Sequence, residues 1–253
     1  IKGMGYYVPE RIMSNFDFEK ILDTNDEWIR TMTGVEERRF AAPEEATSDL
    51  CVKAAEKALK VAGMTIEDID MIIVATVTPD YPVQSTACLV QYKMGARNVA
   101  SFDVNAACSG FIYSLTIAGS MIRSGIYKNV LVIGAEVLSR ILDMTNRSNC
   151  ILFGDGAAAA VVSEVEEGYG MLSTYLGAKG EDDYILKIPA GGSKKPNDAE
   201  TIANRENFLV MKGGEVFKFA VHALPSATNK ALKIANVKSE ELKMIFPHQA
   251  NIR

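Results

Sequence analysis

The sequence predicts an α/β protein with a largely parallel sheet. Segments with strand character alternate along the chain with segments of helical periodicity, which is the pattern of repeated strand-helix-strand units. One strand-like run, MIIVATVT from Met71, is apolar or β-branched throughout, as expected for a strand covered on both faces. With 253 residues, 48% of them hydrophobic and 23% charged, the chain is long enough to bury a sizeable core.

The predicted elements can be placed in order. A helix over residues 47–62 has the cap-forming residues Thr47 and Ser48 at its start and Gly63 at its end. After the strand at Met71 we expect a helix over about 85–94, a strand over 99–104, a helix after Cys108 that ends at Gly125, and a strand at NVLVIGA, residues 129–135. Residues 177–207 are polar and lack periodicity, which predicts a long, lid-like excursion.

Composition excludes several classes of function. The net charge is −5 and no basic run exceeds the pair Lys194 and Lys195, which argues against a general nucleic-acid binder. We expect no membrane span and no secretory signal, because no apolar run is long enough and no cationic segment opens the chain. The cysteines at 51, 88, 108 and 150 lack metal or disulfide spacing, so we expect no metal site and reduced thiols in the cytoplasm.

An internal repeat organises the chain. ALKVAGMTIEDIDMII, from Ala58, aligns without a gap with ALKIANVKSEELKMIF, from Ala231. Both copies read as a helix end, a cap, a short acidic turn and a strand, and Gly63 is matched by Asn236, the other residue that tolerates the left-handed cap position. Convergence on a common helix-loop-strand pattern is one explanation. Duplication is the other and the better supported, with a second half that is cut short.

Cys108 is the candidate nucleophile. It lies between a predicted strand and a predicted helix, in FDVNAACSGF, and its neighbours are small. A thiol in the first turn of a helix meets unpaired backbone N–H groups and the positive end of the dipole, which favour the thiolate. The alternative is that Cys108 is a small buried hydrophobe. The residues alone leave both interpretations open.

The two histidines are not equivalent. His222 lies at helical spacing in VFKFAVHALP, which is typical of an ordinary helix residue. His248 lies in PHQAN after the predicted strand KMIF, and α/β proteins gather their sites at the carboxyl ends of strands. A turn histidine that caps local backbone is the alternative interpretation.

The sequence resembles the β-ketoacyl-acyl-carrier-protein synthase III family of the thiolase-like condensing enzymes. The resemblance covers essentially the whole chain through TNDEWIRTMTGVEERR, DVNAACSGF, NRSNCILFGDGAAAAVV, GGEVFKFAV and PHQANIR. It implies two pseudo-symmetric βαβαβαββ halves in a layered α-β-α-β-α arrangement, which would account for the repeat. The N-terminal half would then be 1–168, and 169–253 would be the start of a truncated C-terminal half that includes the excursion 177–207.

The resemblance also implies residue roles. Cys108 matches the nucleophile that takes the acyl group from acyl-CoA, and His248 matches the histidine that supports decarboxylation of malonyl-acyl-carrier-protein. The family's catalytic asparagine and its C-terminal glycine-rich segment are expected beyond Arg253. The residues that match CoA-binding positions are Thr24, Trp28, Arg147, Gly213, Phe217 and Asn251.

Three further positions carry specificity in the resemblance, and one departs from it. Val83 stands where many acetyl-selective members have a phenylalanine that closes the partner's acyl pocket, and Lys218 and Arg253 match positions that dock the carrier protein. Met32 departs from the family pattern, because well-studied members have an arginine there that contacts phosphate, and Arg30 is the candidate to replace it.

The expected function is therefore a homodimeric acyltransferase that condenses a short acyl-CoA with malonyl-acyl-carrier-protein, with CoA thioesters as substrates and no metal or redox cofactor. The alternatives are a related acyl-CoA-using condensing enzyme, an ester-forming transferase of secondary metabolism, or a non-catalytic acyl-binding scaffold. The presence of both Cys108 and His248 disfavours the scaffold.

Overall fold

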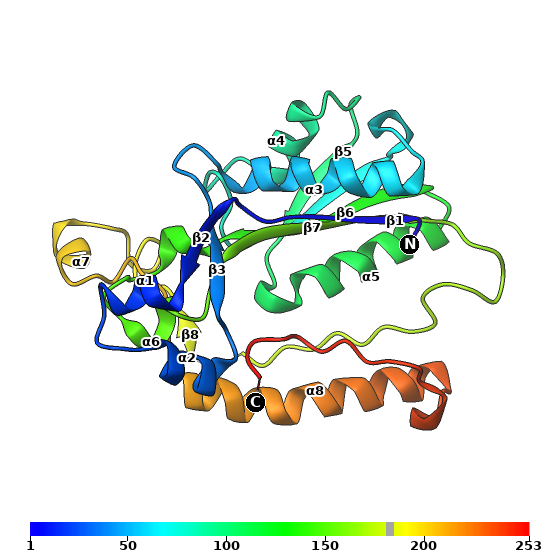
Figure 1. Ribbon diagram of the computed structural model, residues 1–253. Coiled ribbons are helices and arrows are strands. Elements are labelled where there is room, and N and C mark those ends of the chain that lie inside the picture. Colours follow the sequence, from blue (N-terminus) through cyan, green and yellow to red (C-terminus); the bar gives the residue numbers. More distant parts are fainter. Residues whose placement is uncertain (181–184, 253) are drawn as a thin grey trace. The chain divides into compact units, whose positions relative to one another are not determined.

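The chain folds as two compact units. The computed structural model describes residues 1–180 and 185–252 (Figure 1). The first unit consists of Ile1–Ile12, Arg39–Leu138 and Gly154–Met171; the second consists of Met13–Arg38, Ser139–Phe153 and the described residues from 172 onward. None of the described helices has both the length and the apolar character needed to cross a membrane. The boundary between duplicated halves at residue 168 stays a prediction.

The first unit is built on a mixed five-stranded sheet. Its strands, in the order in which they pair, are β1 (Gly3–Tyr7), β7 (Asp155–Ser163), β6 (Asn129–Val137), β4 (Met71–Ala75) and β5 (Ala100–Val104). β6, β4 and β5 run parallel, as predicted, whereas β7 is antiparallel to both of its neighbours. The parallel part matters for the site, because the carboxyl ends of β6, β4 and β5 meet at one edge.

Helices cover both faces of this sheet. α3 (Thr47–Ala62) lies on one face and α5 (Gly110–Arg123) on the other, as Figure 1 shows. Side chains of β4 alternate between them: Ile72 and Val74 pack in the α3 core, and Met71 and Ile73 in the α5 core. All five residues of β4 are buried, which confirms the prediction of a strand covered on both sides.

The predicted helices and strands of this unit form within a residue or two of their expected bounds. α3 and β6 start where predicted, α4 spans Thr86–Lys93, β5 spans Ala100–Val104, and Gly125 follows the end of α5 with φ +75°. The start of α3 differs in detail, because its N-cap is Ala46. The Thr47 and Ser48 hydroxyls instead donate to the Thr78 carbonyl and to Asp80, at 2.5 and 2.6 Å.

Glycines let the edge strand β1 lie directly on α3. A Cβ at Gly3 would lie 2.3 Å from the Ala58 carbonyl oxygen, and one at Gly5 would lie 2.4 Å from that of Ala54. Any side chain at these two positions would force the strand away from the helix.

The second unit contains the remaining elements. They are β2 (Arg11–Ser14), which begins in the first unit, α1 (Asn15–Glu19), α2 (Asp26–Thr33), β3 (Glu37–Phe40), which ends in the first unit, α6 (Arg147–Cys150), β8 (Leu186–Lys187), α7 (Ala199–Ala203), β9 (Val210–Met211) and α8 (Gly213–Ala235). β2 pairs with β3, and β8 pairs with β9 in antiparallel fashion. Cys150 is the last residue of the short helix α6.

The described part of the excursion 177–207 is tied down in this unit. Arg205 forms a bidentate ion pair with Asp143, at 2.8 and 2.6 Å, and its guanidinium also lies over the Phe208 ring. Just after the excursion, the Leu209 N–H donates to the Ile141 carbonyl at 2.8 Å. The excursion therefore has anchored structure of its own in α7 and its flanking turns.

The internal repeat is visible in the structure. α3 ends at Gly63 with φ +65°, and α8 ends at Asn236 with φ +54°, so both copies use a left-handed cap. A 3-10 turn follows each cap, at Ile66–Asp68 and at Ser239–Glu241. The strand predicted at KMIF does not form: Met244, Ile245 and Phe246 are exposed, and no strand among the described residues pairs with them.

Candidate functional site

Cys108 lies at the carboxyl edge of the parallel strands. It is in the 3-10 turn Ala107–Ser109 that joins β5 to α5, and it is exposed. The preceding residue, Ala107, has φ +45°, a left-handed conformation that costs an alanine energy and therefore marks a turn fixed by its surroundings. A Cβ at Gly110 would lie 3.0 Å from the Ala75 Cβ, so glycine lets the start of α5 approach β4 closely.

The pKa of Cys108 differs from the expectation. Surrounding protein atoms desolvate the thiol although the residue is exposed, and this desolvation raises the pKa above its ordinary value. The backbone N–H of Cys108 lowers the pKa, and the negative charge of Glu136 raises it further. Because the turn is 3-10 and α5 begins two residues later, the helix start does not outweigh these effects. In the single chain, the surroundings of Cys108 therefore disfavour the thiolate, in contrast to the helix-start interpretation of the sequence.

The other cysteines lack this setting. Cys51 and Cys150 are buried, and burial raises the pKa of each, that of Cys150 to about 11. Cys88 is half-buried in α4, with its thiol 3.7 Å from the Ser101 carbonyl oxygen. Of the four cysteines, all in the described part of the chain, Cys108 is the exposed one.

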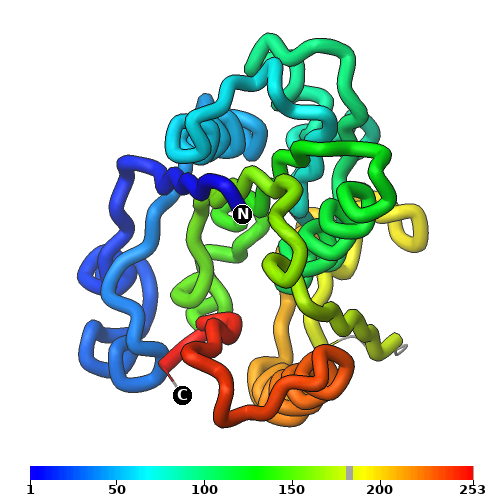
Figure 2. The backbone as a smooth tube through the Cα atoms, turned by 90° about the vertical axis from the view of Figure 1, so that its right-hand side faces the viewer, coloured from blue at the N-terminus to red at the C-terminus, as the bar shows by residue number. Residues whose placement is uncertain are grey.

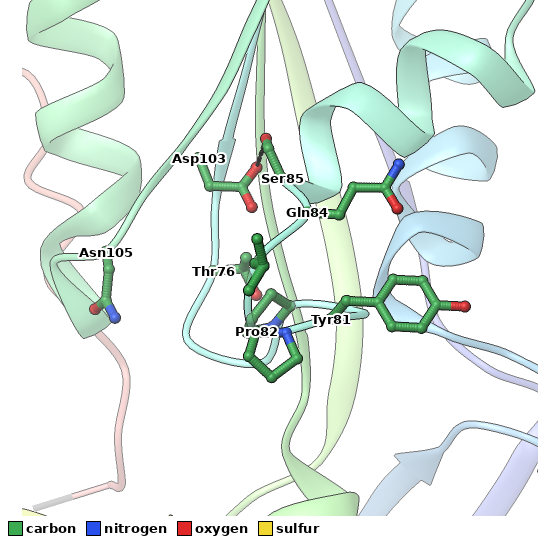
Figure 3. A pocket seen from close by; sticks show the side chains of 9 residues that line it. Thr76, Tyr81, Pro82, Gln84, Ser85, Asp103 and Asn105 are labelled. Atoms are coloured by element: carbon green, nitrogen blue, oxygen red, sulfur yellow. Dashed lines mark hydrogen bonds between the residues drawn. The ribbon is translucent and has the colours of Figure 1, made fainter. Parts of the chain in front are cut away.

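A pocket of ≈ 340 Å³ lies beside this edge in the first unit. It is lined by Thr76, Pro79, Tyr81, Pro82, Val83, Gln84, Ser85, Asp103 and Asn105. In Figure 3 Ser85 and Asp103 point toward one another, joined by a 2.8 Å hydrogen bond, and the Tyr81 ring extends away from them. Val83 is 97% exposed, so within one chain its side chain has almost no packing partner.

Trp28 and Arg147 lie together in the second unit. The Arg147 guanidinium is 5.3 Å from the centroid of a Trp28 ring, and it also donates to the Asp23 carbonyl. Trp28 lies in the first turn of α2, where its backbone N–H donates to the side chain of the N-cap residue Asn25 at 2.7 Å. The Thr24 hydroxyl is buried without a hydrogen-bond partner in the described structure.

The C-terminal segment that carries His248 contacts the end of α2, the helix of Trp28. The Ile252 N–H donates to the Thr33 carbonyl at the end of α2, at 3.0 Å. Figure 2 shows the red C-terminal segment reaching the blue region around α2. His248 and Asn251 are exposed in this segment, and Gly213 and Phe217 lie in the first turns of α8. Cys108 and His248 belong to different units.

The remaining residues predicted from the sequence are exposed, except Arg253, which is not among the described residues. Lys218 is exposed on α8, and Arg253 lies outside the described residues. Arg30, the possible substitute for the arginine missing at Met32, forms ion pairs with Glu36 at 3.0 Å and with Asp26 at 3.7 Å. His222 is an exposed helix residue whose Nδ1 lies 2.8 Å from the Lys218 carbonyl oxygen, in agreement with the sequence interpretation.

The sequence did not single out two charged residues, Glu136 and Arg38. Glu136 lies at the end of β6, and the signal was a lone charge in the apolar run NVLVIGAEVL. Arg38 is 4% exposed; it donates to Asn15 Oδ1 and to the Ile151 carbonyl that follows α6, and Asn15 in turn donates to Asp26 in α2. Arg38 thus connects the helix of Trp28 to the helix of Arg147. Burial lowers the pKa of Arg38 to about 10.

Comparisons with known proteins identify the family. The profile described as 3-Oxoacyl-[acyl-carrier-protein (ACP)] synthase III matches residues 102–180, which include Cys108. The chain is 63% identical over its whole length to the beta-ketoacyl-[acyl-carrier-protein] synthase III of Fusobacterium nucleatum, of which it covers 77%. It is 53% identical over its whole length to that of Caldanaerobacter subterraneus, of which it covers 76%.

A solved structure agrees with these relatives. The crystal structure of 3-oxoacyl-[acyl-carrier-protein] synthase III from Aquifex aeolicus superposes with a TM-score of 0.89 at 46% identity, over 100% of this chain and 77% of that one. The likeness confirms the thiolase-like α/β fold implied by the resemblance. The chain therefore belongs to the β-ketoacyl-acyl-carrier-protein synthase III family.

Proposed function

We propose that this protein initiates fatty-acid synthesis by condensing a short acyl-CoA with malonyl-acyl-carrier-protein to give β-ketoacyl-acyl-carrier-protein. The observation that supports this most directly is 63% identity, over the whole chain, to a protein named for that activity. The position of Cys108, exposed at the edge where three parallel strands end, is consistent with an acyl-transfer nucleophile.

In the first half-reaction we assign Cys108 as the nucleophile. Its sulfur attacks the thioester carbonyl of acyl-CoA, the bond to the CoA sulfur breaks, and CoA leaves as the thiol with the proton lost from Cys108. Backbone N–H groups at the start of α5 are suited to stabilise the oxyanion of the tetrahedral intermediate. Trp28, Arg147, Thr24, Gly213, Phe217 and Asn251 are proposed to bind CoA.

In the second half-reaction His248 supports decarboxylation. The malonyl carboxylate leaves as CO₂, and an imidazole N–H stabilises the negative charge that develops on the thioester oxygen. The resulting carbanion attacks the acyl group on Cys108, forms the new carbon–carbon bond and releases the cysteine sulfur. Both CoA and carrier thioesters enter as substrates, and we propose that no further cofactor takes part.

We also propose a homodimer in the cytoplasm. The connection from β4 to α4, residues 76–85, supports the dimer, because it carries the 97% exposed Val83 and the exposed Tyr81, which are suited to burial against a second copy. The free cysteines support a reducing compartment.

The test is the mass of the full-length protein after incubation with acetyl-CoA, followed by addition of malonyl-acyl-carrier-protein. We expect one acetyl group on Cys108, then its loss with release of CO₂ and formation of acetoacetyl-carrier protein. A protein that forms no adduct would be an acyl-binding scaffold. An adduct that reacts with an alcohol instead of the malonyl carrier would indicate an ester-forming transferase.

Acyl-chain selectivity is expected to depend on Val83. If this side chain closes the acyl pocket of the partner copy, valine leaves more depth than the phenylalanine of acetyl-selective relatives. Each additional buried methylene contributes at most about 0.8 kcal/mol, so butyryl-CoA and isovaleryl-CoA should compete well with acetyl-CoA. In Val83→Phe, kcat/KM for butyryl-CoA relative to acetyl-CoA should fall about tenfold. A wild type that already rejects the longer primers would contradict this role.

Carrier docking is expected to depend on Lys218, with Arg253 as its proposed partner in the dock. Lys218→Glu should slow association with the acidic carrier protein several-fold and weaken the salt dependence of that step, because a surface charge steers encounter more than it holds the complex. Acetyl-CoA use should remain near wild type. Lys233→Glu, an exposed charge reversal at the far end of α8, is the control. Equal carrier kinetics in the two variants would exclude Lys218 from the dock.

A further inference from the structure

The connection from β4 to α4, residues 76–85, is an arm held at three points by carboxylates. At its end, Asp103 accepts hydrogen bonds from the Ser85 hydroxyl and from the Thr86 and Ala87 N–H groups, at 2.7 to 2.8 Å. In its middle, Asp80 accepts from the N–H and the hydroxyl of Ser48, at 2.9 and 2.6 Å. At its start, the carboxylate is that of Glu136.

Glu136 accepts hydrogen bonds from three donors at the start of the arm. Its Oε1 accepts from the Val77 N–H at 2.8 Å, and its Oε2 accepts from the hydroxyls of Thr78 and Thr76. The Thr78 hydroxyl is oriented, because the oxygen itself accepts from the Val137 N–H at 2.9 Å and so donates its own proton to Glu136. Every one of these donors is neutral. The arrangement ties the end of β4 to the end of β6.

The tip of the arm depends on this base. Tyr81 is 58% exposed and Val83 is 97% exposed, so the tip itself makes few contacts that could hold it within the chain. Thr76, at the base of the arm, and Pro82 line the same pocket as Val83, and Figure 3 labels the first two. A change at the base would therefore move the pocket wall and the Val83 side chain together.

Glu136 also acts on Cys108. β5, which leads to Cys108, and β6, which carries Glu136, flank β4 in the sheet. Desolvation raises the pKa of Glu136, and its carboxylate is the charged group that raises the pKa of the Cys108 thiol. The other charges around the arm, those of Asp80, Asp103 and Lys93, together with Glu136, act on the buried Cys51.

We propose that Glu136 is a positioning residue that fixes the 76–85 arm, and with it the Val83 side chain and the pocket that the arm lines, and thereby sets which acyl chains the enzyme accepts. The effect on selectivity rests on the proposed function. The contacts at the end of β6 are independent of the proposed function, because Glu136 accepts hydrogen bonds from the arm within the single chain.

The first test is Glu136→Gln in the full-length protein. Glutamine keeps the size but places an NH₂ group against the threonine hydroxyls, so that at least one donor loses its acceptor. We expect the ratio of kcat/KM for butyryl-CoA to that for acetyl-CoA to change about fivefold or more, mainly through KM. We also expect the pH midpoint for alkylation of Cys108 by iodoacetamide to fall, since a negative charge near the thiol is removed. A merely structural role would leave this midpoint unchanged.

Two further variants separate position from charge. Thr78→Val removes one donor and keeps the carboxylate, so it should change acyl-chain selectivity in the same direction while the Cys108 alkylation midpoint stays closer to wild type. This variant also carries the test if Glu136→Gln does not fold, as judged by thermal unfolding. The matched control is Glu164→Gln, an exposed glutamate just after β7, which should match wild type in both measurements.

The outcomes are distinct. Folded Glu136→Gln and Thr78→Val proteins with the selectivity and alkylation profile of wild type would overturn the assignment. Acylation of wild type by acetyl-CoA, measured in the same series, tests the proposed function separately. The alkylation profile needs no acyl-CoA, so it still tests the link from Glu136 to Cys108 if no acyl-CoA reacts.

Discussion

Cys108→Ala should form no acyl-enzyme from any acyl-CoA, and its condensation rate should fall by about a thousandfold or more, the scale seen when a covalent nucleophile is removed. The reason is chemical, because no other group in the β5–α5 turn can form the thioester that activates the acyl carbon. The measurement is intact-protein mass after incubation with acetyl-CoA, together with product formation from malonyl-acyl-carrier-protein. Cys88→Ala, which changes a half-buried thiol in α4, is the matched control and should acylate normally.

The pH dependence of Cys108 follows from the sign of its pKa shift. Because the pKa is raised, the thiolate fraction is small at neutral pH and grows as the pH rises toward and above the ordinary value of a cysteine. Alkylation of Cys108 should therefore accelerate across pH 7 to 9 without a plateau near neutrality. A plateau at neutral pH, or equal labelling of Cys88 under native conditions, would contradict this environment.

The features that sequence predicted well are those set by local rules. The bounds of α3 follow from the apolar spacing and from Gly63, which takes the left-handed conformation that ends the helix. The equivalence of Gly63 and Asn236 was predicted in the same way, and both residues adopt positive φ. The burial of β4 followed from its unbroken apolar run, because such a strand is stable only with both faces covered.

The features that sequence missed depend on neighbours far along the chain. The strain at Ala107 has no local signal, because the residue that takes positive φ is an alanine, which disfavours that conformation. The sign of the Cys108 pKa shift depends on desolvation and on Glu136 at the end of another strand, which only the sheet order brings near. The KMIF segment has the composition of a strand, yet a strand needs a hydrogen-bonded neighbour, and none of the described strands supplies one.

His248→Ala should separate the two half-reactions. Acylation of Cys108 should persist within a few-fold of wild type, whereas CO₂ release from malonyl-acyl-carrier-protein should fall by about 10²- to 10³-fold, the usual cost of losing one donor to a developing oxyanion. Paired assays of acetyl-adduct mass and CO₂ release measure the two steps. Thermal unfolding checks that the variant is folded, which we expect because His248 is exposed.

His248→Gln sharpens the assignment. If the imidazole acts as an N–H donor, an amide donor at the same position should recover part of the decarboxylation lost in His248→Ala, and it should do so without the pH dependence that a titrating base would impart. The competing role for His248 is that of a base that takes the proton from Cys108. The raised pKa of Cys108 gives such a base a purpose. Loss of acylation and decarboxylation together in a folded His248→Ala protein would assign that role to His248 and would contradict a role confined to the malonyl half-reaction.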